Sequence, residues 1–149
     1  MPRSPLGKPL IVTQGFRANK DKYGPQGHTG IDLRSRLDDP WFSCVPGFVH
    51  FKGKWPYLTG YGAYIELDWG QNDGSYIKFI YGHSKNRRKE LDNKHVAEGT
   101  KLAVSGNTGW STAAHLHFEM RHYRPGKAGY TLLNPIEFLE QYKIPYTVA

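Results

Sequence analysis

The amino-acid sequence predicts a mainly β fold, organised as a single domain over residues 1–149 with an antiparallel sheet and one short helix near the C-terminus. A chain of 149 residues has the length of one typical domain. Its 17 Gly and 10 Pro indicate many turns and argue against a helical bundle. Between these turns lie short apolar or alternating segments, which is the pattern of antiparallel strands.

The expected strands are short and are separated by glycine-rich turns. The clearest is 63–69, in which the apolar residues Ile65 and Leu67 alternate with acidic residues, so that one face is apolar and the other polar. Residues 70–75 read Gly-Gln-Asn-Asp-Gly-Ser and predict a hairpin loop, which leads to a return strand at 76–81. The other expected strands span 11–16, 31–33, 45–51, 101–104 and 116–121.

One short helix is predicted near the C-terminus, over about residues 135–142. Asn134 can cap it, Pro135 suits the first helical position, and Glu137 completes a capping-box pattern. The helix is expected to stop before Pro145. Its apolar face consists of Ile136, Phe138 and Leu139.

Charge and cysteine content narrow the classes of function. The formal net charge of +7 favours anionic partners such as nucleic acid, anionic lipid or wall polymers, although solubility explains it equally well. The one dense basic run, 85–89, precedes Glu90 and Asp92 and is interpreted as a solvated loop. Cys44 is the only cysteine, so the fold depends on its core or on a metal rather than on a disulfide. Residues 1–10 have no apolar stretch long enough for a signal peptide, and no segment is long enough to span a membrane.

The segment 115–120 reads His-Leu-His-Phe-Glu-Met. In a strand, His115, His117 and Glu119 share one face, while the apolar residues between them share the other and can pack on a core. Two imidazoles side by side on a rigid strand can form part of a metal site. The alternative is a pair of surface histidines, because a His-x-His pair alone is a weak signal.

A second segment, 28–32, reads His-Thr-Gly-Ile-Asp. His28 and Asp32 point to the same face of an extended chain, and Gly30 is interpreted as removing a side chain that would crowd a metal. The alternative is a turn whose aspartate accepts backbone hydrogen bonds. Together the two segments offer two histidines and one carboxylate. Three N and O ligands, with a position left for water, are the pattern of a catalytic zinc site.

With these segments the sequence resembles the lysostaphin-type zinc metallopeptidases, many of which are peptidoglycan hydrolases. Residues 28–32 are similar to the family's His-x-Gly-x-Asp element, and residues 115–119 are similar to its His-Leu-His-Phe-Glu element. Further matches follow in family order, so that the resemblance covers about residues 13–121. They are a glycine-rich turn and strand at 60–67, a Tyr-x-His element at 81–83, and turns at 96–99 and 106–109.

The resemblance implies roles for five residues. His28, Asp32 and His117 would bind one zinc ion per chain. His115 and His83 would be catalytic residues that stand beside the metal without binding it. One would take a proton from the attacking water and the other would stabilise the oxyanion, and we assign these roles to His115 and His83 respectively. The site would lie in a substrate groove floored by the sheet.

The function that the resemblance implies is zinc-dependent hydrolysis of peptide bonds in the stem or cross-bridge of bacterial peptidoglycan. The protein is then expected to act as a monomer at the bacterial cell wall, either outside the cell or as part of a virion, with no nucleic-acid partner. One alternative is an inactive wall-binding or regulatory module of the same fold. Another is a nucleic-acid-binding β domain, which rests on charge and aromatic content and leaves the five site residues unexplained.

Three departures from the family pattern bear on substrate preference. Ser84 stands where leucine is usual, Ala113 and Ala114 stand where glycine is frequent, and Cys44 stands where alanine is common.

Other polar and aromatic residues receive simpler interpretations. Glu119 is expected to hydrogen-bond to a ligand rather than to bind the metal. Tyr61 and Trp110 are expected in loops near the matched motifs, where each either lines the groove or is a packing residue. The remaining histidines are expected at surface or structural positions: His50, His95 and His122.

Overall fold

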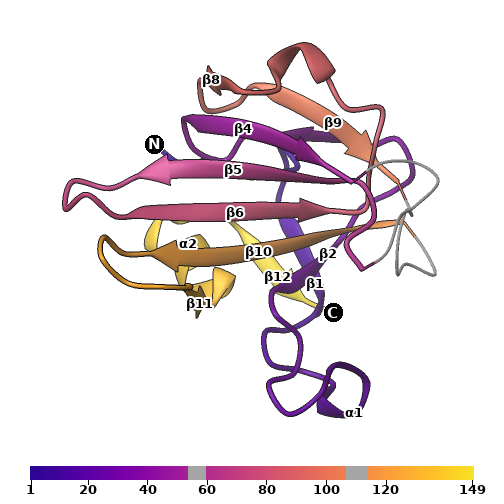
Figure 1. Ribbon diagram of the computed structural model, residues 1–149. Helices are drawn as coiled ribbons and strands as arrows, with labels where there is room; N and C mark the ends of the chain where they lie inside the picture. Colours follow the sequence, from indigo (N-terminus) through magenta and orange to yellow (C-terminus); the bar gives the residue numbers. More distant parts are fainter. Residues whose placement is uncertain (54–59, 107–113) are drawn as a thin grey trace.

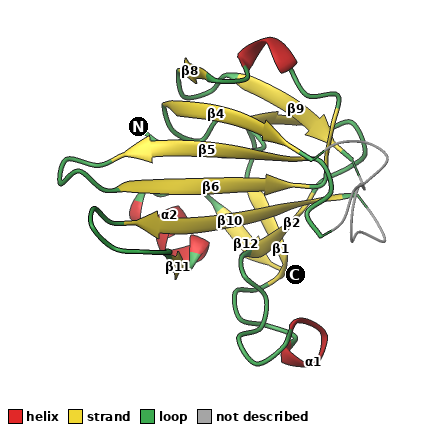
Figure 2. Cartoon of the chain, viewed as in Figure 1, coloured by secondary structure: helices red, strands yellow, loops and turns green. Residues whose placement is uncertain are grey.

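The computed structural model describes residues 1–53, 60–106 and 114–149. Strands dominate these residues, and the helices are short (Figures 1 and 2). The strands are β1 (Leu10–Gln14), β2 (Ile31–Arg34), β3 (Pro40–Phe42), β4 (Gly47–Lys52), β5 (Tyr64–Gly70), β6 (Tyr76–Gly82), β7 (Ser84–Lys85), β8 (Lys94–Val96), β9 (Lys101–Ser105), β10 (His115–Tyr123), β11 (Thr131–Leu133) and β12 (Tyr146–Val148). The helices are α1 (Lys20–Tyr23), the 3-10 turn η1 (Lys89–Leu91) and α2 (Pro135–Gln141). None of these helices is long and apolar enough to cross a membrane. The prediction of a mainly β fold is confirmed.

Within the described residues, most strands belong to one nine-stranded sheet in the order β12-β1-β2-β10-β6-β5-β4-β8, with β11 paired to β10. Neighbouring strands are antiparallel, except that β12 pairs with β1 in parallel. The long strands β5, β6 and β10 lie side by side (Figure 1). A second sheet has the order β3-β9-β7. Because β10 is hydrogen-bonded to β2 on one side and to β6 on the other, it is a rigid support for the side chains that it carries.

The predicted alternation of side chains is present in β5 and β10. In β5, Ile65 and Leu67 are fully buried, whereas Glu66 between them is partly exposed. In β10, Leu116 and Phe118 are fully buried and join the core. Replacing such a buried phenylalanine by alanine costs about 3–5 kcal/mol of stability. The apolar face of β10 therefore anchors the strand and leaves its polar face for other contacts.

Helix α2 covers the face of the sheet that the histidines of β10 do not use. Asn134 Oδ1 caps it, as predicted, by accepting a hydrogen bond from the amide two residues later at 3.0 Å. Phe138 of the helix is buried, with its ring centroid 5.1 Å from that of Phe79 in β6. Phe79 pairs with Met120 of β10, which lies three residues after His117 and therefore points to the opposite face.

The strands that the sequence did not predict are the shortest ones. β3, β8, β11 and β12 have three residues each, and β7 has two. An alternating pattern needs four or more residues to be recognised, so these segments carry no signal of their own. Strand β4 begins at Gly47 rather than at 45, which places Pro46 outside it, as expected of a residue without an amide donor.

The basic run 85–89 is more than the solvated loop that the sequence predicted. Arg87 is partly buried, and its Nη2 donates to the Gly53 carbonyl at 3.1 Å, while its Nη1 donates to the Lys52 carbonyl. Its guanidinium also lies 5.6 Å from the ring centroid of Phe51. Arg87 therefore secures the end of β4, and its charge serves the fold.

Candidate metal centre

His28 and Asp32 come from the turn before β2 and from β2 itself. Backbone hydrogen bonds fix this turn, because the His28 amide donates to the Ala18 carbonyl at 2.8 Å and the Arg17 amide donates to the His28 carbonyl at 2.8 Å. The side chains are 3% and 10% exposed, and His28 Nε2 lies 3.2 Å from Asp32 Oδ1. The turn and the strand thus bring the two polar groups together in a buried position.

The register of the sheet brings in His117. Its backbone pairs with Asp32 of β2 on one side and with Gly82 of β6 on the other. A Cβ at Gly82 would lie 3.1 Å from the His117 Cβ, so a residue without a side chain leaves room for the imidazole. The result is that a central strand delivers His117 directly beside Asp32.

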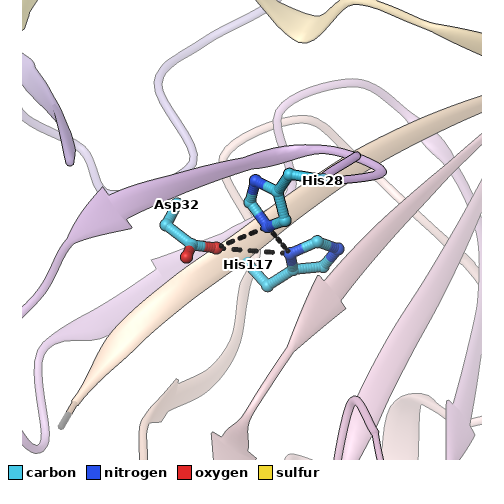
Figure 3. A group of neighbouring side chains, drawn as sticks. All are labelled: His28, Asp32 and His117. Carbon is cyan, nitrogen blue, oxygen red and sulfur yellow. Dashed lines mark hydrogen bonds and ion pairs between the residues drawn. The ribbon is translucent and has the colours of Figure 1, made fainter. Parts of the chain in front are cut away.

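Three donor atoms from these residues form a nearly equilateral triangle (Figure 3). His28 Nε2 lies 3.1 Å from His117 Nδ1, His117 Nδ1 lies 3.3 Å from Asp32 Oδ1, and the third side is 3.2 Å. Tetrahedral zinc, with bonds of about 2.0–2.2 Å, separates its ligand atoms by roughly 3.3–3.6 Å. The donor set therefore suits a zinc ion, and its spacing is close to the lower end of this range.

The outward nitrogens of both imidazoles have acceptors of their own. His28 Nδ1 lies 3.2 Å from the Gly15 carbonyl oxygen, and His117 Nε2 lies 2.9 Å from Glu119 Oε1. Since a carbonyl and a carboxylate can only accept, each outward nitrogen carries the proton, which leaves a lone pair on the inward nitrogen. Two lone pairs and a carboxylate oxygen then face one another, an arrangement that a cation stabilises.

The carboxylates around this triangle are held in their ionised form. Burial alone would raise the pKa of Asp32, but the imidazoles of His117 and His28 beside it outweigh burial and keep that pKa well below its usual range. Burial acts in the same direction on Glu119, yet hydrogen bonds with His117, Thr29 and Tyr61 lower its pKa to about 2. Asp32 is therefore available as an anionic donor, and Glu119 as an anionic acceptor behind His117.

His83 and His115, which are predicted to stand beside the metal without binding it, line the same cavity as the three predicted ligands. His83 and His115 have ring centroids 4.7 Å apart, and His115 Nε2 lies 3.6 Å from Asp32 Oδ1. All five predicted site residues line one cavity of about 450 Å³. His83 has a φ of +69°, a conformation that is costly for a residue with a side chain. Its amide donates to the Tyr61 carbonyl at 2.7 Å, which helps to hold it there.

The reason for Gly30 differs from the one that the sequence suggested. A Cβ at this position would lie 2.4 Å from the Phe118 carbonyl oxygen and 3.0 Å from the Glu119 Cα. The side chain would therefore collide with the backbone of β10 rather than crowd a metal. Glycine is needed because the 28–32 segment approaches β10 closely.

We expect Gly30→Ala to force this segment away from β10. The overpacking should cost about 1–3 kcal/mol of stability and should weaken metal binding, because His28 and Asp32 lie on either side of the displaced residue. Thermal unfolding and metal titration of the variant test this. Gly126→Ala is a useful control, since Gly126 has open space around it and a positive φ, 71°, so that it carries backbone strain alone. Equal metal affinity in the two variants would contradict the expectation.

Several contributors to the site carried no recognised signal in the sequence. The Gly15 carbonyl and the Tyr23 ring, whose centroid lies 5.0 Å from that of His28, come from the turn between β1 and β2. Thr29 Oγ1 donates to Glu119 Oε1 at 2.6 Å. Arg121 could have been found, because alternation along β10 places it on the same face as His117 and Glu119.

The structure also bears on the simpler interpretations given to the other polar and aromatic residues. Tyr61 lines the cavity, as expected, whereas Trp110 and Ala113 lie outside the described residues. Ser84, which stands where leucine is usual, is buried, and its Oγ donates to the Ala63 carbonyl at 2.5 Å. Cys44 is buried and free, as expected of a small apolar residue. The remaining histidines do not line the cavity: His50, His95 and His122.

Known proteins have sequences similar to this chain. The model of peptidase family M23 matches residues 26–131, a range that contains all five predicted site residues. The DD-carboxypeptidase/endopeptidase Mpg of Neisseria meningitidis is 28% identical over 119 residues, which cover 76% of this chain and 26% of that protein. The glycyl-glycine endopeptidase ALE-1 of Staphylococcus capitis is 33% identical over 104 residues, which cover 65% of this chain and 27% of that protein. The chain spans about a quarter of the length of these curated relatives.

Solved structures show the same fold. The catalytic domain of the prophage-encoded M23 protein EnpA from Enterococcus faecalis matches with a TM-score of 0.68 and 26% identity, over 87% of this chain and 92% of that domain. The catalytic domain of the antimicrobial peptidase lysostaphin from Staphylococcus simulans matches with a TM-score of 0.62 and 29% identity, over 78% and 82% of the two chains. The antiparallel sheet, the triangle of donors and the match over residues 26–131 lead to one conclusion: the chain belongs to peptidase family M23.

Proposed function

We propose that the protein is a zinc-dependent endopeptidase that hydrolyses peptide bonds in the stem or cross-bridge of bacterial peptidoglycan. The observation that carries this proposal is the triangle of His28 Nε2, Asp32 Oδ1 and His117 Nδ1, with sides of 3.1–3.3 Å, at the wall of a cavity of about 450 Å³. Membership of family M23 and the endopeptidase names of its relatives support a peptidase.

Zinc would be held by these three atoms, one ion per chain. Bound there, it supplies Lewis acidity, which polarises the scissile carbonyl and makes water a better nucleophile. The protein's own contribution is to present both inward lone pairs and to keep Asp32 ionised. The Gly15 carbonyl and Glu119 hold the outward protons of His28 and His117, so neither ring has to reorient on binding the metal.

The two remaining histidines would move protons. His115 Nε2 lies 3.6 Å from Asp32 Oδ1, and the residue lines the cavity; it would accept the proton of the attacking water. His83, with its ring 4.7 Å from that of His115, would donate a hydrogen bond to the oxyanion of the tetrahedral intermediate. We assign the role of proton acceptor to His115 because of its contact with Asp32.

The alternative functions receive less support. A wall-binding or regulatory module of the same fold would have no need of three preorganised donors with two further histidines beside them. Nucleic-acid binding rests on net charge and aromatic content alone. The cavity wall combines cationic side chains, Lys22 and Arg34, with the predicted metal site, which is compatible with a peptide substrate that carries carboxylates.

Two measurements test the proposal. Metal analysis of purified protein should find about one zinc per chain, as expected for three protein ligands and water. Incubation with peptidoglycans of defined chemistry, followed by mass spectrometry of the fragments, should reveal new peptide termini and identify the bond that is cut. Zinc-loaded protein that releases no new termini from any of them would support the binding-module alternative.

The basic run at residues 85–89 offers a way for the protein to reach the anionic cell wall, and this can be tested. Lys85 pairs with Asp38 at 3.1 Å and Arg88 with Glu90 at 2.8 Å, but such exposed pairs are weak, so their cations can still attract a polyanion. We expect lysis of intact cells to fall steeply with salt, because attraction between exposed charges is screened within about 8 Å at physiological ionic strength. Cleavage of a small neutral peptide should change little.

A triple variant, Lys85→Gln, Arg88→Gln and Lys89→Gln, should lower both the rate of whole-cell lysis and its dependence on salt. Arg87 is retained because it secures β4. The matched control removes three exposed cations elsewhere: Arg124→Gln, Lys127→Gln and Lys143→Gln. Lysis that is indifferent to salt and to the first variant would show that the charge serves solubility only, and equal effects of both variants would implicate net charge rather than the run.

A further inference from the structure

Behind His117 lies a fully buried carboxylate with an unusual number of partners. The Glu119 side chain is 0% exposed. Its Oε1 accepts from Thr29 Oγ1 at 2.6 Å and from the Tyr61 hydroxyl at 2.6 Å, in addition to His117 Nε2 at 2.9 Å. Its Oε2 accepts from Arg121 Nε at 2.6 Å. Partners from the turn before β2, the loop before β5, and β10 therefore converge on one carboxylate.

Arg121 supplies the compensating charge in this cluster. Its side chain is 17% exposed, and its guanidinium lies 4.4 Å from the ring centroid of Tyr130. Its Nη2 also donates to the Tyr61 hydroxyl at 3.1 Å. Removing one partner of a buried ion pair leaves an uncompensated charge, which costs far more than the loss of an exposed pair. Glu119 can therefore hold the His117 proton only while Arg121 is in place.

Tyr61 links this cluster to the other side of the cavity. Its hydroxyl donates to Glu119 and accepts from Arg121, and its ring lies against the His117 ring with centroids 5.2 Å apart. Its main-chain carbonyl accepts the His83 amide at 2.7 Å, at the residue whose φ is +69°. Tyr61 thus contacts the acceptor of the His117 proton through its side chain and holds the His83 amide through its main chain.

We propose that Arg121 and Tyr61 are positioning residues of the metal centre, which act through Glu119 to fix the ring orientation and tautomer of His117. The inference rests on the proposed function, in which His117 Nδ1 is a zinc ligand. Outer partners of this kind orient ligating histidines, and their loss typically lowers metal affinity by about 10–100-fold. The contact of Tyr61 with His83 is made by the main-chain carbonyl, so Tyr61→Phe leaves it in place and tests only the contacts of the hydroxyl with Glu119 and Arg121.

The test compares zinc affinities of single variants, measured by competition with a chromogenic chelator. Arg121→Met and Tyr61→Phe should each bind zinc more weakly than the wild type, by about 10–100-fold for Arg121→Met. Arg121→Lys should recover part of the loss, since it restores the charge without the planar fork. The controls are Arg124→Met and Tyr64→Phe. Tyr64 shares the polar face, and its ring centroid lies 5.4 Å from that of Tyr61.

Nitrogen-15 chemical shifts of the imidazoles distinguish a role in positioning His117 from a role in the stability of the fold alone. In the wild type, His117 should show a protonated Nε2 and a metal-bound Nδ1, and in Arg121→Met and Tyr61→Phe this pattern should be lost or mixed. Zinc affinity within twofold of the controls, or an unchanged His117 pattern in both variants, would overturn the inference while the wild type still binds zinc. A wild-type protein that binds no zinc would instead overturn the proposed function.

Discussion

Replacing His28, Asp32 or His117 by alanine, one at a time, is expected to remove zinc and to abolish peptide hydrolysis. Each change leaves two protein donors, where a catalytic site needs three. The loss of affinity should exceed the roughly 10–100-fold that follows from removing an outer partner. Metal analysis after dialysis against zinc-free buffer measures the first effect, and the release of new termini from peptidoglycan measures the second.

Three other histidines provide the matched controls: His50, His95 and His122. His50 and His95 lie against Phe48, with ring centroids 4.9 and 5.0 Å from it, and His122 Nε2 lies 2.9 Å from Ser75 Oγ. Alanine at these positions should keep both zinc and activity. Full zinc occupancy in all three ligand variants would contradict the assignment of the metal site.

Alanine at His115 or His83 is expected to separate metal binding from catalysis. Neither residue belongs to the triangle, so zinc should stay bound. Loss of a proton acceptor or an oxyanion donor should nevertheless reduce kcat by about a hundred-fold or more. The measurement is a steady-state assay on a defined peptide, at zinc occupancy equal to that of the wild type.

The two variants also test the division of roles. A general base is inactive when protonated, so the fall in rate at low pH reports the protonation of that base. If His115 is the proton acceptor, this fall should disappear in His115→Ala and persist in His83→Ala. A variant of either residue with near-normal turnover would show that its histidine is a bystander. Zinc lost together with activity would mean that the residue supports the metal instead.

The sequence predicted the fold well wherever an element was long enough to show its period. Strand β10 is the clearest case, because alternation alone separates Leu116 and Phe118, which are buried in the core, from His115 and His117 on the other face. The cap of α2 at Asn134 was equally readable, since it depends on residue types at fixed local spacings. The short strands β7 and β12 depend on partners that are distant in the chain, and no local pattern predicts them.

The sequence selected the residues of the candidate site, but it did not predict how their donor atoms are arranged. Similarity to a known family selected His28, Asp32 and His117, and their ligand roles remain predictions. That their donor atoms converge depends on the register between β2 and β10, which no local pattern specifies. The same holds for Gly30, because the need for glycine there depends on the backbone of β10 beside it. It also holds for Arg87, whose carbonyl partners lie at the end of β4.

The pairing of β2 with β10 has a thermodynamic consequence. It brings His28 and His117, 89 positions apart in the sequence, to a contact of 3.1 Å between their nitrogens. A cation shared by both closes a long loop that an unfolded chain cannot keep closed, in a protein whose single Cys44 offers no covalent substitute. Binding to the folded state alone adds RT ln(1 + [M]/Kd) to the free energy of unfolding, about 4 kcal/mol when free metal exceeds Kd a thousand-fold. The melting temperature should therefore rise with free zinc concentration, and a chelator should act on this protein as a mild denaturant.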